Sequence, residues 1–355
     1  MIATRLAFIF TKDFGIDTLI FGATATFKNM KTIAILVPET AVLAAIVDPR
    51  YMFTAVNEFL KSADKPPLFD VKLVGLTKEV KLTDGLFSVH TDATIKTIKK
   101  ADLIIIPAIS RDLENAIKKN KEFFPWIIQQ YKNGAEVASL CIGAFLFAST
   151  GLLDGKKCST HWLFANEFRT MFPEVELVDN KIVTEQNGLY SSGGANSYWN
   201  LLLHLVEKYT SREMAILASK FFVLDIDRKT QSPFTIFKGQ KIHEDTDIVK
   251  VQDHIEKNFK EKITVDELSE EFGIGRRTLE RRFKKATNNT VTEYIQRVKI
   301  EASKKELETG RKTVSEVMYD VGYTDTKAFR EVFRKVTQMS PIDYRKKYNR
   351  EAITA

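Results

Sequence analysis

The sequence predicts two folded parts: a three-layer α/β domain with a mostly parallel sheet, then an all-α domain with two helix-turn-helix motifs. Three observations support this prediction. Apolar segments alternate with helical patterns over residues 32–208. A helical pattern recurs in the last third of the chain, where 49 residues separate Thr264 from Thr313. A polar, proline-containing stretch at residues 227–234 lies between the two regions, and 355 residues suffice for two or three domains.

The α/β prediction rests on continuous apolar runs, which are typical of strands buried on both faces. Helical patterns follow Pro49 and extend across residues 112–131, where Asn133-Gly134 supplies a stop. Alternation of this kind predicts a parallel sheet with helices on both sides. The expected strands are Ile33–Val37, Phe69–Val74 and Leu103–Ile106.

One strand-to-helix turn carries the main chemical signal of this region. The expected strand Val137–Leu140 leads directly into Cys141, and the small residues Gly143 and Ala144 then open a helix. A sharp turn of this kind exposes the side chain at its apex, and a helix N-terminus favours the thiolate. His161 follows twenty residues later, where it could lie beside the thiol.

Each copy of the C-terminal repeat predicts a helix-turn-helix motif. Thr264 and Thr313 each stand three residues before a glutamate, which is the spacing of a capping box. Gly273 and Gly322 then end a short helix, since glycine adopts a left-handed turn at little cost. An amphipathic second helix follows each turn. Its inward anchors are Leu279 and Phe283 in the first copy and Phe329 and Phe333 in the second.

The outward faces of these second helices are basic, which suits phosphates and base edges of DNA. The first face carries Arg276, Arg277, Glu280, Arg281, Arg282, Lys284 and Lys285, and the second carries Thr326, Lys327, Arg330, Glu331, Arg334 and Lys335. One long helix, residues 291–307, should hold the two motifs apart. Recognition helices on one face of DNA lie about 34 Å apart.

Composition limits the remaining classes of function. The net charge is +7 and the pI is about 9.1. Two cysteines provide no disulfide framework and indicate a reducing compartment, which we expect to be the cytoplasm. Five scattered histidines show no metal-ligand spacing, so we expect neither a metal nor a cofactor. No apolar run reaches transmembrane length, and residues 1–30 are expected to be an N-terminal extension.

Residues 246–348 resemble the AraC/XylS-type DNA-binding domain, seven helices with two helix-turn-helix motifs. The matching stretches are VDELSEEFGIGRRTLERRFKKAT and TVSEVMYDVGYTDTKAFREVFRKVTQMSPIDYRKKY. The resemblance implies that base contacts fall on Arg277, Glu280 and Arg281 and on Thr326, Lys327, Arg330 and Glu331. Together with Arg276, Lys284 and Arg334 these form the expected DNA-binding set. Gly275 departs from the family pattern, in which serine usually begins the first recognition helix.

Residues 32–208 resemble the PfpI-type proteins of the class I glutamine amidotransferase-like superfamily, in which a cysteine at such a turn is the nucleophile. Leu152–Gly155, Thr160–Trp162 and Ser191–Ala195 also carry the resemblance. Proteases of that superfamily have histidine directly after the cysteine, where this chain has Ile142. Related hydrolases place an acid near the position of Ala44-Ala45, and Glu39 lies too early to replace it.

We therefore expect Cys141 and His161 to be remnants of a catalytic pair and the chain not to be an enzyme, because a hydrolase needs nucleophile, base and orienting acid together. The predicted ligand-binding set is Cys141, Ile142, His161, Gly193 and Gly194. The expected domains are the extension at 1–30, a sensor domain at 31–210, a linker helix and connector at 211–245, and a DNA-binding domain at 246–350.

The sequence thus predicts a DNA-binding transcription regulator controlled by a small effector. Its expected partners are double-stranded promoter or operator DNA, the effector, RNA polymerase and a second copy of the chain, with no membrane. Two alternatives remain open at this point. One is a cysteine-dependent amidase or deglycase-type hydrolase, and the other is a redox sensor that acts through oxidation of Cys141.

Overall fold

A computed structural model describes residues 30–241 and 243–349. The chain divides into two compact units, Met1–Lys229 and Thr230–Ala355. The expected N-terminal extension lies outside the described residues, apart from Met30.

A seven-stranded sheet forms the centre of the first unit, as far as its residues are described. All neighbouring strands are parallel except the pair β10 and β11 at one edge. The predicted, mostly parallel sheet is therefore confirmed. Across the sheet the order is β10 (Val183–Gln186), β11 (Leu189–Ser192), β7 (Glu136–Ser139), β6 (Leu103–Ile106), β1 (Lys31–Leu36), β2 (Phe69–Gly75) and β5 (Ala93–Thr94).

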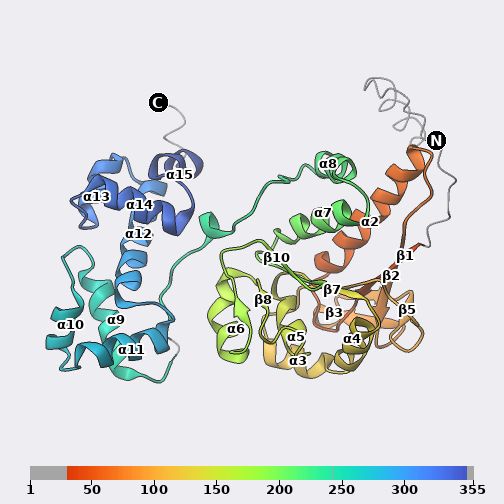
Figure 1. Cartoon of the computed structure of the whole chain (residues 1–355), viewed down its shortest axis with the longest axis horizontal. Coiled ribbons are helices and arrows are strands. Elements are labelled where there is room, and N and C mark those ends of the chain that lie inside the picture. The colour runs from red at the N-terminus through yellow and green to blue at the C-terminus, as the bar shows by residue number, and fades with distance from the viewer. Residues whose placement is uncertain (1–29, 242, 350–355) are drawn as a thin grey trace. The chain divides into compact units, whose positions relative to one another are not determined.

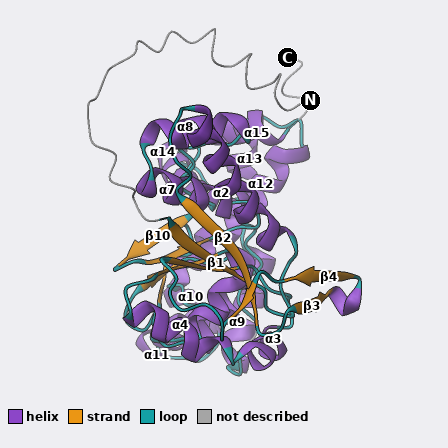
Figure 2. Cartoon of the chain, turned by 90° about the vertical axis from the view of Figure 1, so that its right-hand side faces the viewer, coloured by secondary structure: helices purple, strands orange, loops and turns teal. Residues whose placement is uncertain are grey.

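The central strands are buried on both faces, as their continuous apolar sequences predict. Side chains from Ile33 to Leu36 in β1 are at most 1% exposed, and those of β6 are fully buried. Two small pairs of strands stand outside the main sheet: β3 (Glu79–Leu82) with β4 (Phe87–His90), and β8 (Lys157–Cys158) with β9 (Glu176–Leu177). Figure 2 shows the β3–β4 hairpin extending from one edge of this unit.

Helices cover both faces of the sheet, so the unit has three layers (Figure 1). On one face lie α2 (Ala44–Ser62), α7 (Tyr198–Tyr209) and α8 (Arg212–Phe221), and on the other lie α3 (Leu113–Asn120), α4 (Phe123–Lys132), α5 (Ala144–Ala148) and α6 (Ala165–Met171). The single helical pattern expected across residues 112–131 is in fact two helices, α3 and α4. Pro125 explains the break, because its ring would collide with the carbonyl of Lys121 in a continuous helix.

The second unit is all-helical in its described part, residues 243–349, and agrees with the predicted fold class. Its helices are α9 (Thr246–Asn258), α10 (Val265–Glu271), α11 (Arg276–Thr287), α12 (Val291–Thr309), α13 (Val314–Asp320), α14 (Thr326–Thr337) and α15 (Pro341–Tyr348). Helix α12 is the single long helix expected between the motifs. It extends from the group of α9–α11 to the group of α13–α15 (Figure 1) and contributes side chains to a separate apolar core in each group.

The polar stretch ahead of α9 packs along the second unit. We call residues 230–241 the connector. Near its start, the Tyr348 hydroxyl of α15 donates to the carbonyl of Pro233 at 3.0 Å. Near its end, the Gln252 amide of α9 donates to the carbonyl of Gln240 at 2.9 Å. The connector therefore contacts both helical groups, whereas α8 of the expected linker region packs against α2 and α7 in the first unit.

A buried ion pair of α12 holds the middle of the connector. Lys304, 3% exposed, donates from Nζ to the Thr235 carbonyl at 2.6 Å and to Glu301 at 2.7 Å. Glu301 accepts the backbone N–H of Phe237 at 3.1 Å. The pair thus satisfies one donor and one acceptor of the connector backbone.

Candidate DNA-binding and ligand-binding sites

The two helix-turn-helix motifs form as the local sequence signals predict. Thr264 and Thr313 both make complete capping boxes, at the starts of α10 and α13. Gly273 and Gly322 take left-handed backbone angles, with φ of 63° and 75°, in the turns that follow these helices. The second helices are α11 and α14, whose aromatic anchors Phe283 and Phe333 are fully buried. Each motif is therefore a short capped helix, a glycine turn and an anchored recognition helix.

The structure exposes all ten residues of the expected DNA-binding set. They lie on α11 and α14, on the side away from the buried anchors of those helices. The set consists of Arg276, Arg277, Glu280, Arg281, Lys284, Thr326, Lys327, Arg330, Glu331 and Arg334. Five arginines and two lysines stand against two glutamates, so the face offers an excess of donors to phosphates and base edges.

Ion pairs occupy part of the face of α11. Arg276 lies 2.9 Å from Asp266 and 3.6 Å from Glu280. These pairs are exposed, and exposed pairs contribute little stability, so DNA phosphates can compete for the guanidinium. Two of the seven charged residues expected on this face are therefore already engaged with each other.

Arg282 has a different role from that expected of an outward-facing cation. Its guanidinium is within 2.5 Å of Asp245 and 3.0 Å of Asp247, at the start of α9. Hydrogen bonds to the two aspartates hold its pKa above the usual range. Arg282 thus ties α11 to α9, and its assignment to the free basic face is wrong.

The predicted strand-to-helix turn is present at Cys141. Strand β7 ends at Ser139, and Cys141 adopts a φ of 53°, unusual for a residue with a side chain. A Cβ added to Gly143 would lie 2.3 Å from the Pro107 carbonyl oxygen. The turn therefore passes directly over the end of β6, and only glycine fits at that crossing.

Burial opposes the activation of the Cys141 thiol that a helix N-terminus favours. The side chain is 6% exposed, and burial raises its pKa to about 12. A helix N-terminus would lower this pKa, but the five-residue α5 has too few aligned peptide groups to overcome desolvation. At neutral pH the group is therefore a thiol.

The predicted ligand-binding residues converge only in part. The Cys141 amide donates to Ser192 Oγ at 3.3 Å, which places the turn beside Gly193 and Gly194 at the end of β11. The Thr160 hydroxyl donates to the Cys141 carbonyl at 3.2 Å. These contacts bring together three segments at the carboxyl ends of β7 and β11, an edge where α/β proteins commonly bind ligands.

His161 follows Thr160, but its ring is held within its own turn. Nδ1 accepts the backbone N–H of Leu163 at 3.1 Å. Burial, with a contribution from Arg111, lowers the pKa of His161 and favours its neutral form. The contacts of His161 thus orient it as the cap of a short helical turn.

An acid–hydroxyl pair that no sequence pattern indicated lies near the thiol. The Tyr198 hydroxyl of α7 donates to Asp48 Oδ2 of α2 at 2.6 Å. Burial, Asp48 and the neighbouring Cys141 all raise the pKa of Tyr198. Asp48 lies one helical turn beyond Ala44-Ala45, the position near which related hydrolases place an acid. Glu39, the carboxylate considered instead, is 57% exposed and lies 3.7 Å from Lys119.

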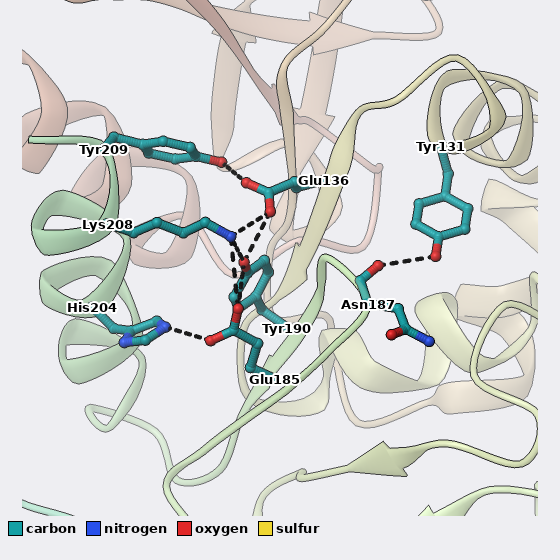
Figure 3. Close-up of polar contacts among 8 residues, drawn as sticks. All are labelled: Tyr131, Glu136, Glu185, Asn187, Tyr190, His204, Lys208 and Tyr209. Carbon is teal, nitrogen blue, oxygen red and sulfur yellow. Dashed lines mark hydrogen bonds and ion pairs between the residues drawn. The ribbon is translucent and has the colours of Figure 1, made fainter.

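A second polar cluster, also missed, lies at the opposite end of β7 (Figure 3). Glu136 accepts hydrogen bonds from Tyr190 at 2.9 Å, from Lys208 at 2.5 Å and from Tyr209. Burial opposes ionisation of Glu136, but these three donors hold its pKa below the usual range. Glu185 of β10 also lies 2.9 Å from the Tyr190 hydroxyl, so the two carboxylates share its single proton. The cluster joins α7 to three strands.

Two further classes of site find no support in the described residues. No group of three or more His, Cys, Asp or Glu side chains among residues 30–241 and 243–349 is arranged to hold a metal ion. None of the helices described there combines the length and apolar character needed to cross a membrane.

Comparisons with known proteins match both units. Residues 33–208 match the DJ-1/PfpI family, and residues 268–347 match a helix-turn-helix domain family. Among similar proteins of Pseudomonas aeruginosa, the HTH-type transcriptional regulator GbdR is 26% identical over 76% of this chain and 72% of its own length. The HTH-type transcriptional regulator CdhR is 23% identical over 73% of this chain and 76% of its own length. The chain therefore belongs to the AraC-type transcription regulators and carries a DJ-1/PfpI-family domain ahead of its DNA-binding region.

Proposed function

We propose that α11 and α14 read two successive segments of the major groove, and that base contacts are made by Arg277, Glu280 and Arg281 in the first motif and by Thr326, Lys327, Arg330 and Glu331 in the second. The observation that carries the proposal is the exposure of all these side chains on two capped, anchored helices. Arg276, Lys284 and Arg334 supply further contacts to the DNA. The protein acts in the cytoplasm as a homodimer that recruits RNA polymerase.

Substitution of Arg281 tests the base contacts. Binding sites are first selected from random double-stranded DNA by the full-length protein. Arg281→Ala should then weaken binding by about 1–3 kcal/mol at one base pair and relax the preference there. Lys257→Ala, an exposed cation of α9 outside the recognition helices, is the matched control. Equal weakening on every DNA sequence would show that Arg281 contacts phosphate instead.

A small effector bound at the edge formed by Cys141, Ile142, His161, Gly193 and Gly194 is the proposed regulatory signal. Support comes from the convergence of the Cys141 turn with the ends of β7 and β11. The effector must bind two arrangements of the protein with different affinity if it is to change DNA binding. The connector gives a physical route, because it is fixed to the second unit at both of its ends. Selection of DNA with and without a metabolite library identifies the effector.

We further propose that the Cys141 turn is not catalytic. A thiol with a pKa of about 12 is a poor nucleophile and a poor target of peroxide. This property argues against both the hydrolase and the redox-sensor alternatives. Incubation with amide, ester and glyoxal substrates, with Cys141→Ser as the control, tests the first. DNA binding that responds to peroxide in the wild type but not in Cys141→Ser would establish the redox-sensor alternative.

A further inference from the structure

A buried lysine lies between the two helix-turn-helix motifs. Lys299 is in the middle of α12 and is 7% exposed. Its Nζ donates to the carbonyl of Glu261 and to the carbonyl of Gly322, both at 3.2 Å, and lies 5.5 Å from the centre of the Tyr323 ring. A charged group is rarely buried in this way unless its hydrogen bonds are satisfied.

The two carbonyls belong to different motifs. Glu261 precedes by three residues the Thr264 cap that starts α10 of the first motif. Gly322 is the left-handed turn between α13 and α14 of the second motif. One side chain thus joins the start of the first motif to the turn of the second.

The backbones of the two motifs also approach each other at this point. A Cβ added to Gly322 would lie 2.1 Å from the Lys260 carbonyl oxygen and 2.8 Å from Lys299 Nζ. At the equivalent turn of the first motif, a Cβ added to Gly273 meets nothing within 4 Å. The repeat therefore uses two similar turns differently, and only the second is pressed against the other motif.

Apolar contact between the two groups includes Phe259, at the end of α9, which packs against the core of the second motif. The core of the first motif uses Val291, Tyr294 and Ile295 of α12, and the core of the second uses Ile300 and Leu307. Lys299 lies between these two sets along the helix. Burial lowers its pKa, yet an amine donates two hydrogen bonds whether or not it is protonated. The bridge consequently does not depend on charge.

We propose that Lys299 is a positioning residue that fixes the rotational phase of α11 and α14 and thereby sets the spacing of the two DNA segments the protein accepts. The proposal rests on the proposed reading of both segments by one chain. A protein without the bridge still reads each segment, but tolerates a wider range of spacings. The residue thus acts on the geometry of recognition and makes no base contact.

The spacing dependence of DNA binding tests this role. Full-length protein is titrated on its selected site and on sites in which one or two base pairs are inserted between the two half-segments. One inserted pair rotates the second segment by about 34°. Wild type should lose at least about tenfold in affinity, because a rigid bivalent reader cannot engage both segments. Lys299→Met should bind the original site more weakly, and its affinity should fall by less than about threefold when a base pair is inserted.

Matched variants separate the possible failures. Lys305→Met, an exposed lysine of the same helix, should behave as wild type. Gly322→Ala should flatten the spacing dependence, whereas Gly273→Ala, with similar backbone strain but open space, should retain it. A wild-type protein indifferent to spacing would overturn the reading of two segments by one chain. Normal wild-type dependence with an unchanged Lys299→Met or Gly322→Ala profile would overturn the role of Lys299 alone.

Discussion

The buried pair of Lys304 and Glu301 should contribute strongly to the stability of the second unit. The two side chains are 4% and 13% exposed and 2.7 Å apart. Lys304→Met keeps most of the apolar stem and removes the charge. Glu301 then remains in the interior without its cation, and the Thr235 carbonyl loses its donor. Both changes disfavour the folded state.

The size of the effect follows from which group is left unpaired. Removal of one member of a buried ion pair costs about 3–5 kcal/mol. Partial exposure of Glu301 places this site near the lower limit, about 3 kcal/mol. In the Lys304→Met/Glu301→Gln variant, the neutral amide can still accept from Phe237. This double variant should therefore lose about 1 kcal/mol of stability, the value of one hydrogen bond.

Urea denaturation of the full-length protein measures these changes. All three tryptophans, Trp126, Trp162 and Trp199, belong to the first unit. Their fluorescence therefore monitors that unit, while circular dichroism at 222 nm also follows the helical second unit. A loss of 3 kcal/mol should lower the circular-dichroism midpoint by about 1–3 M urea. The fluorescence midpoint should not move.

A double-mutant cycle provides the refutation. Since the two residues are in contact, their effects should not add. The coupling, which is the loss in the double variant minus the sum of the two single losses, should be at least about 2 kcal/mol in size. Additive losses, or a loss below about 1 kcal/mol for Lys304→Met, would show that the pair is too hydrated to matter. In that case the connector is held by its apolar and terminal contacts instead.

Three further predictions concern the first unit. Iodoacetamide should modify Cys141 of the native protein very slowly at pH 7, since a pKa of about 12 leaves about one thiolate in 10⁵ molecules; a rate equal to that of the urea-unfolded chain, measured by mass spectrometry, would contradict this. The unfolded thiol ionises above a pKa of about 9, whereas the folded thiol keeps its proton. The unfolded state then binds fewer protons, so the free energy of unfolding falls as pH rises from 9 to 12. Cys141→Ser should reduce this pH dependence in fluorescence-detected urea titrations, and an unchanged pH dependence would refute the buried thiol. Tyr198→Phe removes the hydroxyl that donates a hydrogen bond to Asp48, and it should lower the free energy of unfolding by about 1–3 kcal/mol. Tyr51→Phe, at a 53% exposed position, should cost little in the same assay. Equal losses in the two variants would argue against the buried pair.

The second unit could be predicted closely because its signals are local. A capping box requires only Thr264 and a glutamate three residues later, and the Gly322 turn requires only one residue type. Both can be seen in a short stretch of sequence. The continuous apolar strand Leu103–Ile106 is a local signal of the same kind, and its bounds are those of β6.

Contacts between distant residues could not be predicted in this way. Asp48 and Tyr198 are separated by 150 positions, and no periodicity connects them. Lys299 and Lys304 lie in a helical stretch rich in charge, where lysines are usually solvated. Their burial depends on carbonyls at Glu261 and Thr235, 38 and 69 positions away. Arg282 was misassigned for the same reason, because its aspartates precede it by 35 and 37 residues.

The Cys141 turn combines an unusual backbone conformation with a buried side chain. A left-handed residue with a side chain costs on the order of 1–2 kcal/mol. Two residues later, a Cβ added to Gly143 would lie 2.3 Å from the Pro107 carbonyl oxygen, so the turn runs close to the backbone at the end of β6. Ser192 and Thr160 then fix the Cys141 amide and carbonyl. The unusual conformation therefore lies where the turn after β7 passes over the end of β6. The same contacts place the turn at the carboxyl ends of β7 and β11, where the proposed effector would bind.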